Sequence, residues 1–157
     1  MRLTSTEIET LQALIGKRAF RIFCPPPSIY FNHLEGEGYT IWLDSKPDFV
    51  NFFAAEVAEN RCRMAVERSP TPRGIRYKSG VVSECCDIFK KSLGSSTIRR
   101  IGIYERGNID SSVAFEYAED GGSFVLKAGV FVHELGFWWD FEEANIGEDH
   151  TLRIAIE

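Results

Sequence analysis

Apolar residues near the start of the chain recur at intervals of three and four, which is the spacing of one helix face. These residues are Ile8, Leu11, Leu14 and Ile15. Thr4 and Glu7 stand in the Ser/Thr-x-x-Glu relation of a capping box, in which each side chain bonds the other residue's backbone N–H. Gly16 follows and can take the left-handed backbone that ends many helices. The pattern predicts a helix over residues 5–15.

Shorter stretches that alternate between apolar and polar residues follow, and they predict strands. Residues 17–24 form the first, which must end at three prolines because proline has no N–H for a ladder. Residues 29–34 and 39–44 flank a Glu-Gly-Glu-Gly sequence and predict a hairpin. Residues 46–68 are ambiguous: Pro47 suits the first turn of a short helix followed by a strand, and two strands are the alternative.

The second half of the chain predicts one further helix and then mainly strands. The apolar spacing from Cys85 to Leu93, followed by Gly94, predicts the helix. The alternating stretches after it are 97–105, 113–117, 124–128, 130–132, 137–141 and 152–156. Because short turns join most of them, the strands should pair antiparallel. We therefore expect one α+β domain over residues 1–157, with a mainly antiparallel, strongly bent or two-layered sheet, the N-terminal helix and one or two further helices.

Composition supports a globular domain in the cytoplasm. The chain has 157 residues, of which 44% are hydrophobic and 26% charged, and no apolar run approaches the roughly 18 residues that a membrane span needs. The first residues lack the basic and then apolar pattern of a signal peptide. The four cysteines, Cys24, Cys62, Cys85 and Cys86, include no Cys-x-x-Cys pair. We expect free and mostly buried thiols, and no association with a membrane.

The usual catalytic and metal-binding motifs are incomplete. His133-Glu134 opens like a zinc-protease motif, but the second histidine at helical spacing is missing. There is no nucleophile elbow and no phosphate-binding glycine loop, and the acidic run from Asp140 to Asp149 does not have the order of an EF-hand loop. The sequence thus predicts no catalytic residue, no cofactor and no metal, and it favours a protein that is not an enzyme.

Charge is unevenly divided along the chain. Residues 61–106 carry a net charge of +7 and residues 107–157 a net charge of −9, within an overall charge of −5. If the acidic side chains stay exposed after folding, they would surround aromatic residues and suit a basic protein partner, since aromatic anchors contribute affinity and charge steers association. The candidate partner-binding residues are Glu134, Phe137, Trp138, Trp139, Asp140, Glu142 and Glu143.

In size and charge the chain resembles the small bacterial immunity proteins, which are compact and acidic and neutralise a toxin by covering it. No sequence motif carries this resemblance, so it implies a style of function and no family membership. Nucleic acid is a less favoured partner, because the overall charge is negative and binding the phosphate backbone needs a basic face.

Two alternatives come from the aromatic residues. Trp138 and Trp139 are adjacent, and adjacent strand residues point to opposite faces. We expect one indole in the core and the other covered by a helix, by a partner or by a second copy in a homodimer. The other alternative is an enzyme or small-ligand-binding domain. Its aromatic-lined pocket would be built from Tyr30, Trp42, His133 and Trp138.

Overall fold

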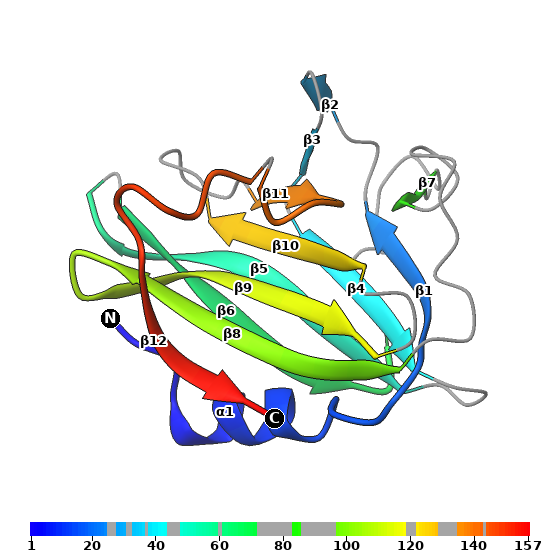
Figure 1. The fold of residues 1–157 in the computed structure, drawn as a ribbon. Coiled ribbons are helices and arrows are strands. Elements are labelled where there is room, and N and C mark those ends of the chain that lie inside the picture. Colours follow the sequence, from blue (N-terminus) through cyan, green and yellow to red (C-terminus); the bar gives the residue numbers. More distant parts are fainter. Residues whose placement is uncertain are drawn as a thin grey trace.

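The computed structural model describes residues 1–24, 28–30, 33–36, 38–43, 48–59, 61–71, 83–85, 97–118, 122–128, 135–142 and 144–157. Its strands form two sheets in which every described strand pair is antiparallel, as the short turns predicted. The sheets face each other with the core between them (Figure 1).

The smaller sheet has five strands in the order β6-β5-β4-β1-β7. Its strands are β1 (Ala19–Cys24), β4 (Gly38–Leu43), β5 (Phe49–Ala58), β6 (Arg61–Ser69) and β7 (Ser83–Glu84). The larger sheet has seven strands in the order β12-β8-β9-β10-β11-β3-β2. Its strands are β2 (Ser28–Tyr30), β3 (His33–Gly36), β8 (Ile98–Arg106), β9 (Ile109–Tyr117), β10 (Ser123–Ala128), β11 (Leu135–Trp138) and β12 (Thr151–Ile156).

Aromatic rings join the two sheets. On the seven-stranded sheet, Phe124 stacks on Phe115 with ring centroids 4.5 Å apart and on Phe137 at 5.5 Å. From the five-stranded sheet, Phe52 meets Phe115 edge-on at 5.6 Å and Tyr39 stacks on Phe137 at 5.5 Å. All five rings are buried, and aromatic pairs of this geometry stabilise a core beyond the area they bury.

The N-terminal helix is confirmed as α1 (Ser5–Gln12), with the capping box between Thr4 and Glu7. It ends a turn earlier than predicted, and residues 13–16 form turns that reach Gly16 at a φ of 76°. Glu7 also ties the helix to β6, because its carboxylate accepts hydrogen bonds from the Val66 N–H and from Arg63, each at 3.0 Å. Burial alone would raise the pKa of Glu7, but the hydrogen bonds to Thr4, Val66 and Arg63 lower it overall.

Residues 46–68 correct our favoured prediction of a helix followed by a strand. Two antiparallel strands, β5 and β6, occupy this region and pair from Phe49↔Ser69 to Ala58↔Arg61. The apolar run at the start of β5 misled the prediction because residues there are buried on both faces of the sheet, so that the two-residue period of a strand is lost.

The predicted hairpin between residues 29–34 and 39–44 is also wrong. β3 pairs with β2 and β11 in the larger sheet, whereas β4 pairs with β1 and β5 in the smaller one. The chain therefore passes from one sheet to the other between Gly36 and Gly38. At Gly38 an added Cβ would lie 2.9 Å from the Phe52 carbonyl oxygen, so the close approach to β5 requires glycine there.

The prediction of one or two further helices is not confirmed: α1 is the one helix whose bounds fall in the described ranges. The predicted helix from Cys85 to Leu93 lies outside them except for Cys85, as does the stretch 130–132. The other strands of the second half are confirmed, although β11 ends at Trp138 instead of Phe141. Cys62 and Cys85 are buried and form no disulfide. No helix in the described ranges is both long enough and apolar enough to cross a membrane.

Candidate functional site

The seven-stranded sheet has an inner face toward the core and an outer face on the other side. Along β9, Val113, Phe115 and Tyr117 belong to the core cluster, while Ala114 between them belongs to a second cluster. Residues of β10 alternate in the same way: Phe124 and Leu126 belong to the core cluster, and Val125 belongs to the second cluster. The outer face of this sheet therefore has apolar contacts of its own.

The chain between β11 and β12 covers part of that outer face. We call residues 139–142 and 144–150 the C-terminal connection. Its Ala144 and Ile146 are buried against Ala114 and Val125. Tyr104, Trp138 and Phe141 pack against the same four residues and are themselves partly buried. The connection is thus held on the sheet by an apolar cluster that has far fewer buried residues than the core cluster.

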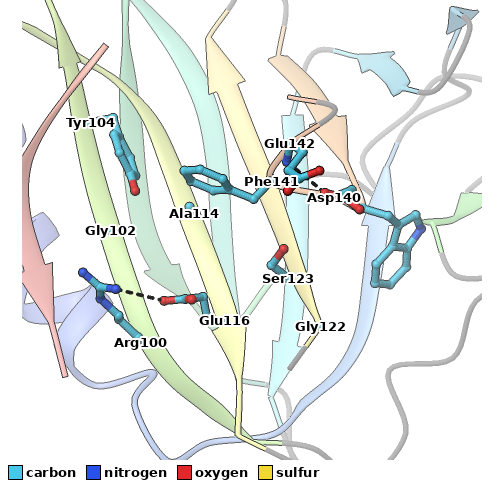
Figure 2. Close-up of a pocket in the computed structure, with 11 residues that line it drawn as sticks. Arg100, Gly102, Tyr104, Ala114, Glu116, Gly122, Ser123, Asp140, Phe141 and Glu142 are labelled. Atoms are coloured by element: carbon cyan, nitrogen blue, oxygen red, sulfur yellow. Dashed lines mark hydrogen bonds and ion pairs between the residues drawn. The ribbon is translucent and has the colours of Figure 1, made fainter. Parts of the chain in front are cut away.

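A cleft of about 720 Å³ opens beside the connection. It is lined by Arg100, Gly102, Tyr104, Ala114, Glu116, Gly122, Ser123, Trp139, Asp140, Phe141 and Glu142. Figure 2 shows Tyr104 and Phe141 projecting from the sheet and the connection at one end, with the Arg100–Glu116 pair further along the strands. The cleft's floor is β8, β9 and β10, so a rigid sheet positions the strand residues.

The charges of the cleft are unequally matched. Arg100 lies between two carboxylates, 3.5 Å from Glu116 and 3.3 Å from Glu157. Asp140 and Glu142 are exposed, and neither forms an ion pair with any residue that the structure describes. The Asp140 carboxylate accepts the Glu142 N–H at 2.8 Å, which fixes the turn that carries both acids. The end of the cleft formed by this turn is therefore negative.

Tyr104 and Phe141 contribute two packed aromatic rings to the apolar part of the cleft. Tyr104 and Phe141 have centroids 5.7 Å apart and are partly buried. Gly102 allows this arrangement, because an added Cβ would lie 2.8 Å from Cε2 of Tyr104. Burial raises the pKa of Tyr104, Arg100 opposes the rise and Glu116 adds to it. The phenol is therefore neutral at pH 7 and can donate a hydrogen bond.

The structure divides the predicted partner-binding residues into core and surface. Phe137 and Trp139 are buried among the core aromatics, with centroids 5.3 Å apart. Trp138 is partly buried on the outer face, with the Lys127 ammonium 6.0 Å from its ring. Asp140 and Glu142 line the cleft. Glu134 and Glu143 lie outside the described residues.

The two adjacent tryptophans behave as the alternation predicted, one on each face of the sheet. The C-terminal connection covers much of Trp138, which packs against the second cluster with Ala144 and Ile146. Its partial burial is therefore supplied within the chain, and the homodimer stays a prediction.

Of the four residues of the alternative pocket, the two whose side chains are described, Trp42 and Trp138, lie apart. Trp42 lies on the smaller sheet between Ile41 and Leu43, which face the core, and it packs against Phe23 and Phe49. It therefore lies on the outer face of that sheet, across the core from Trp138. Tyr30 pairs with His33 between β2 and β3, but its side chain, like all of His133, is outside the described part of the molecule.

Sequence reasoning missed the strand residues of the cleft, namely Arg100, Tyr104, Glu116 and Ser123. The signal was present, since these are the positions of β8, β9 and β10 that alternate with buried residues. Their proximity depends on register, in which Arg100 lies opposite Glu116 and Glu116 opposite Ser123. Register across three strands could not be read from the alternation alone.

The described residues contain no group of three or more His, Cys, Asp and Glu side chains placed to hold a metal ion. Comparisons with protein-family models, with curated proteins and with solved structures found no match. The function must therefore be argued from the cleft itself.

Proposed function

We propose that this protein binds a basic, partly apolar segment of another protein in the cleft on the outer face of the seven-stranded sheet. The observation that carries the proposal is the pairing of two exposed carboxylates, Asp140 and Glu142, with the partly exposed rings of Tyr104 and Phe141. Neither acid has an ion-pair partner among the described residues. Arginine or lysine next to an apolar residue is the chemistry that complements both parts of the site.

Charge favours a cation over an anion or a neutral ligand. The lining residues carry three carboxylates against the guanidinium of Arg100, which Glu116 and Glu157 already neutralise. An incoming guanidinium can bind the Asp140–Glu142 turn and stack on an aromatic ring. Each such contact is worth only about 0.5–1 kcal/mol at an exposed site. Useful affinity therefore requires several contacts at once, as a peptide segment makes them.

We propose binding instead of catalysis because the cleft is open and its acids are on the surface. Carboxylates that act as general acids are usually buried or paired so that their protonation is shifted toward neutral pH. We also propose that the partner is met in the cytoplasm, since Cys62 and Cys85 form no disulfide, as is usual in reducing compartments.

Selection from a displayed library of random dodecapeptides tests the proposal. Wild-type protein should enrich peptides in which arginine or lysine stands beside an apolar residue, and their binding should weaken as salt is raised. The double variant Asp140→Asn/Glu142→Gln should bind the same peptides at least about tenfold more weakly, because two charge-assisted contacts are lost.

Glu148→Gln supplies a matched control, since Glu148 is also exposed on the C-terminal connection but does not line the cleft. It removes one charge and should leave peptide binding nearly unchanged. The proposal is wrong if the library yields no basic preference, or if the double variant and the control retain the selected peptides equally well.

A further inference from the structure

A second polar cluster lies on the outer face of the seven-stranded sheet, beyond the aromatic rings that end the cleft. Ser112 on β9 is opposite Tyr104 on β8 and opposite Lys127 on β10. Opposed residues of antiparallel strands point to the same face, with Cβ atoms about 5 Å apart. Ser112 and Lys127 are therefore neighbours on this face, and neither lines the cleft.

The polar groups of this cluster lack partners. The Ser112 side chain is fully buried, and its Oγ has no hydrogen-bond partner among the described residues. Both ring nitrogens of His150, at the end of the C-terminal connection, are buried and equally unpartnered there. The Lys127 ammonium makes no hydrogen bond or ion pair within the described ranges and contacts the Trp138 ring at 6.0 Å. Buried polar groups are nearly always satisfied, so each of these is an exception that calls for an explanation.

The local charges are mainly positive. Burial lowers the pKa of Lys127, and Arg106 lowers it further by more than Asp149 restores. The pKa of His150 is lowered by burial, then by Lys127 and Arg106, with Asp149 opposing. Asp149 is itself paired with Arg106 at 3.3 Å, and both are about half exposed. The charged groups that act on His150 are thus two cations, Lys127 and Arg106, against the one carboxylate of Asp149.

We propose that Lys127, Ser112 and His150 form a binding site for a small oxyanion, separate from the acidic cleft. An ammonium, a hydroxyl and an imidazole N–H can all donate, and a phosphate or carboxylate oxygen accepts such donors. Lys127 is partly exposed, so that an anion can reach it from solvent. The Trp138 ring beside Lys127 and Tyr104 opposite Ser112 border the site.

Titration of the whole protein with inorganic phosphate and, separately, with acetate tests the site, each at constant ionic strength against chloride. The ¹³Cε1 resonance of His150, assigned with the His150→Gln variant, reports the imidazole pKa. A bound oxyanion should raise that pKa by about one unit, because it favours the charged ring. The response should saturate. A response to phosphate alone assigns a phosphate group, and a response to both ions shows that a carboxylate suffices.

Two variants remove the donors with little change of shape. Lys127→Met should abolish the saturable response, and Ser112→Ala should weaken it several-fold while the fold, checked by circular dichroism, is retained. Lys17→Met removes an exposed lysine outside the cluster and should respond like wild type. Asp140→Asn/Glu142→Gln should also respond like wild type, so the two sites can be tested independently. Absence of a saturable response in wild type, or an equal response in Lys127→Met, would overturn the proposal.

Discussion

The inner and outer faces of the seven-stranded sheet use the same strands for different purposes. On the inner face, Phe124 contacts Phe115, Tyr117, Phe137 and Trp139, and all five rings are buried. On the outer face, the four buried residues of the second cluster are Ala114, Val125, Ala144 and Ile146, and partly exposed rings and charged groups lie beside them. The inner face accounts for stability. The outer face carries the cleft with its exposed acids and partly exposed rings, which is why we place recognition there.

The largest expected effect contrasts two phenylalanines. Phe124→Ala should lower the free energy of unfolding by about 4 kcal/mol, because it removes a fully buried ring from the centre of the aromatic stack. Phe141→Ala on the outer face should cost about 1 kcal/mol or less, since that ring is partly exposed. Urea unfolding of both variants measures the difference, and equal losses would contradict the division between the faces.

A smaller loss of stability is expected when the glycine beneath Trp138, Gly136, is replaced by alanine. At Gly136 an added Cβ would lie 2.4 Å from Cη2 and Cζ3 of the indole, so Gly136→Ala must displace the ring. The cost should be about 2 kcal/mol, which is typical of overpacking. The emission of Trp138 should shift, because its partly buried ring becomes more exposed. Gly147→Ala is the control, because an added Cβ there meets no atom within 4 Å. Gly107→Ala is not suitable, because its φ of 56° is strained for alanine. An unchanged emission spectrum would show that the ring does not lie over β11.

The smallest effect separates two acid-sensitive groups, His150 on the C-terminal connection and Glu7 on helix α1, which is bonded to β6 of the smaller sheet. The pKa of His150 is lowered from 6.5 in the folded protein, so its contribution to stability is present above pH 6.5 and is lost as the pH falls from there toward the folded pKa. The pKa of Glu7 is lowered from 4.5, so its contribution is present above pH 4.5 and is lost as the pH falls through the folded value. Unfolding curves from pH 8 to 3 should show both losses. His150→Gln should remove the first loss alone, and a first loss that persists in this variant would contradict the assignment.

Local signals predicted local structure well. The helix was readable because Thr4 and Glu7 lie three residues apart and make the capping box by themselves. The segment from residue 29 to 44 failed because β3 is placed by β11, about 100 residues later, and no local signal carries that pairing. Likewise, the acids at Asp140 and Glu142 were anticipated, but Tyr104 and Glu116 join them only through the register of β8, β9 and β10.

The uneven charge along the sequence likewise left open which acids would form ion pairs after folding. The tail's acids could have been neutralised by the basic middle segment, and at Asp149 they are, through Arg106. Asp140 and Glu142 form no ion pair with any basic residue in the described ranges, where the arginine of the cleft, Arg100, is already shared by Glu116 and Glu157. Which acids remain unmatched depended on the sheet's geometry and could not be read from composition.

The most direct measurement maps where an arginine side chain binds. A selected peptide and its twin with citrulline in place of arginine differ by one charge and little in shape, and each can be titrated into ¹⁵N-labelled protein. The arginine peptide should shift the amides of Tyr104, Glu116, Ser123 and residues 140–142, and the citrulline peptide should bind at least about tenfold more weakly. Equal binding of the twins, or shifts confined to other surfaces, would contradict the assignment of this cleft as the site that recognises a basic segment.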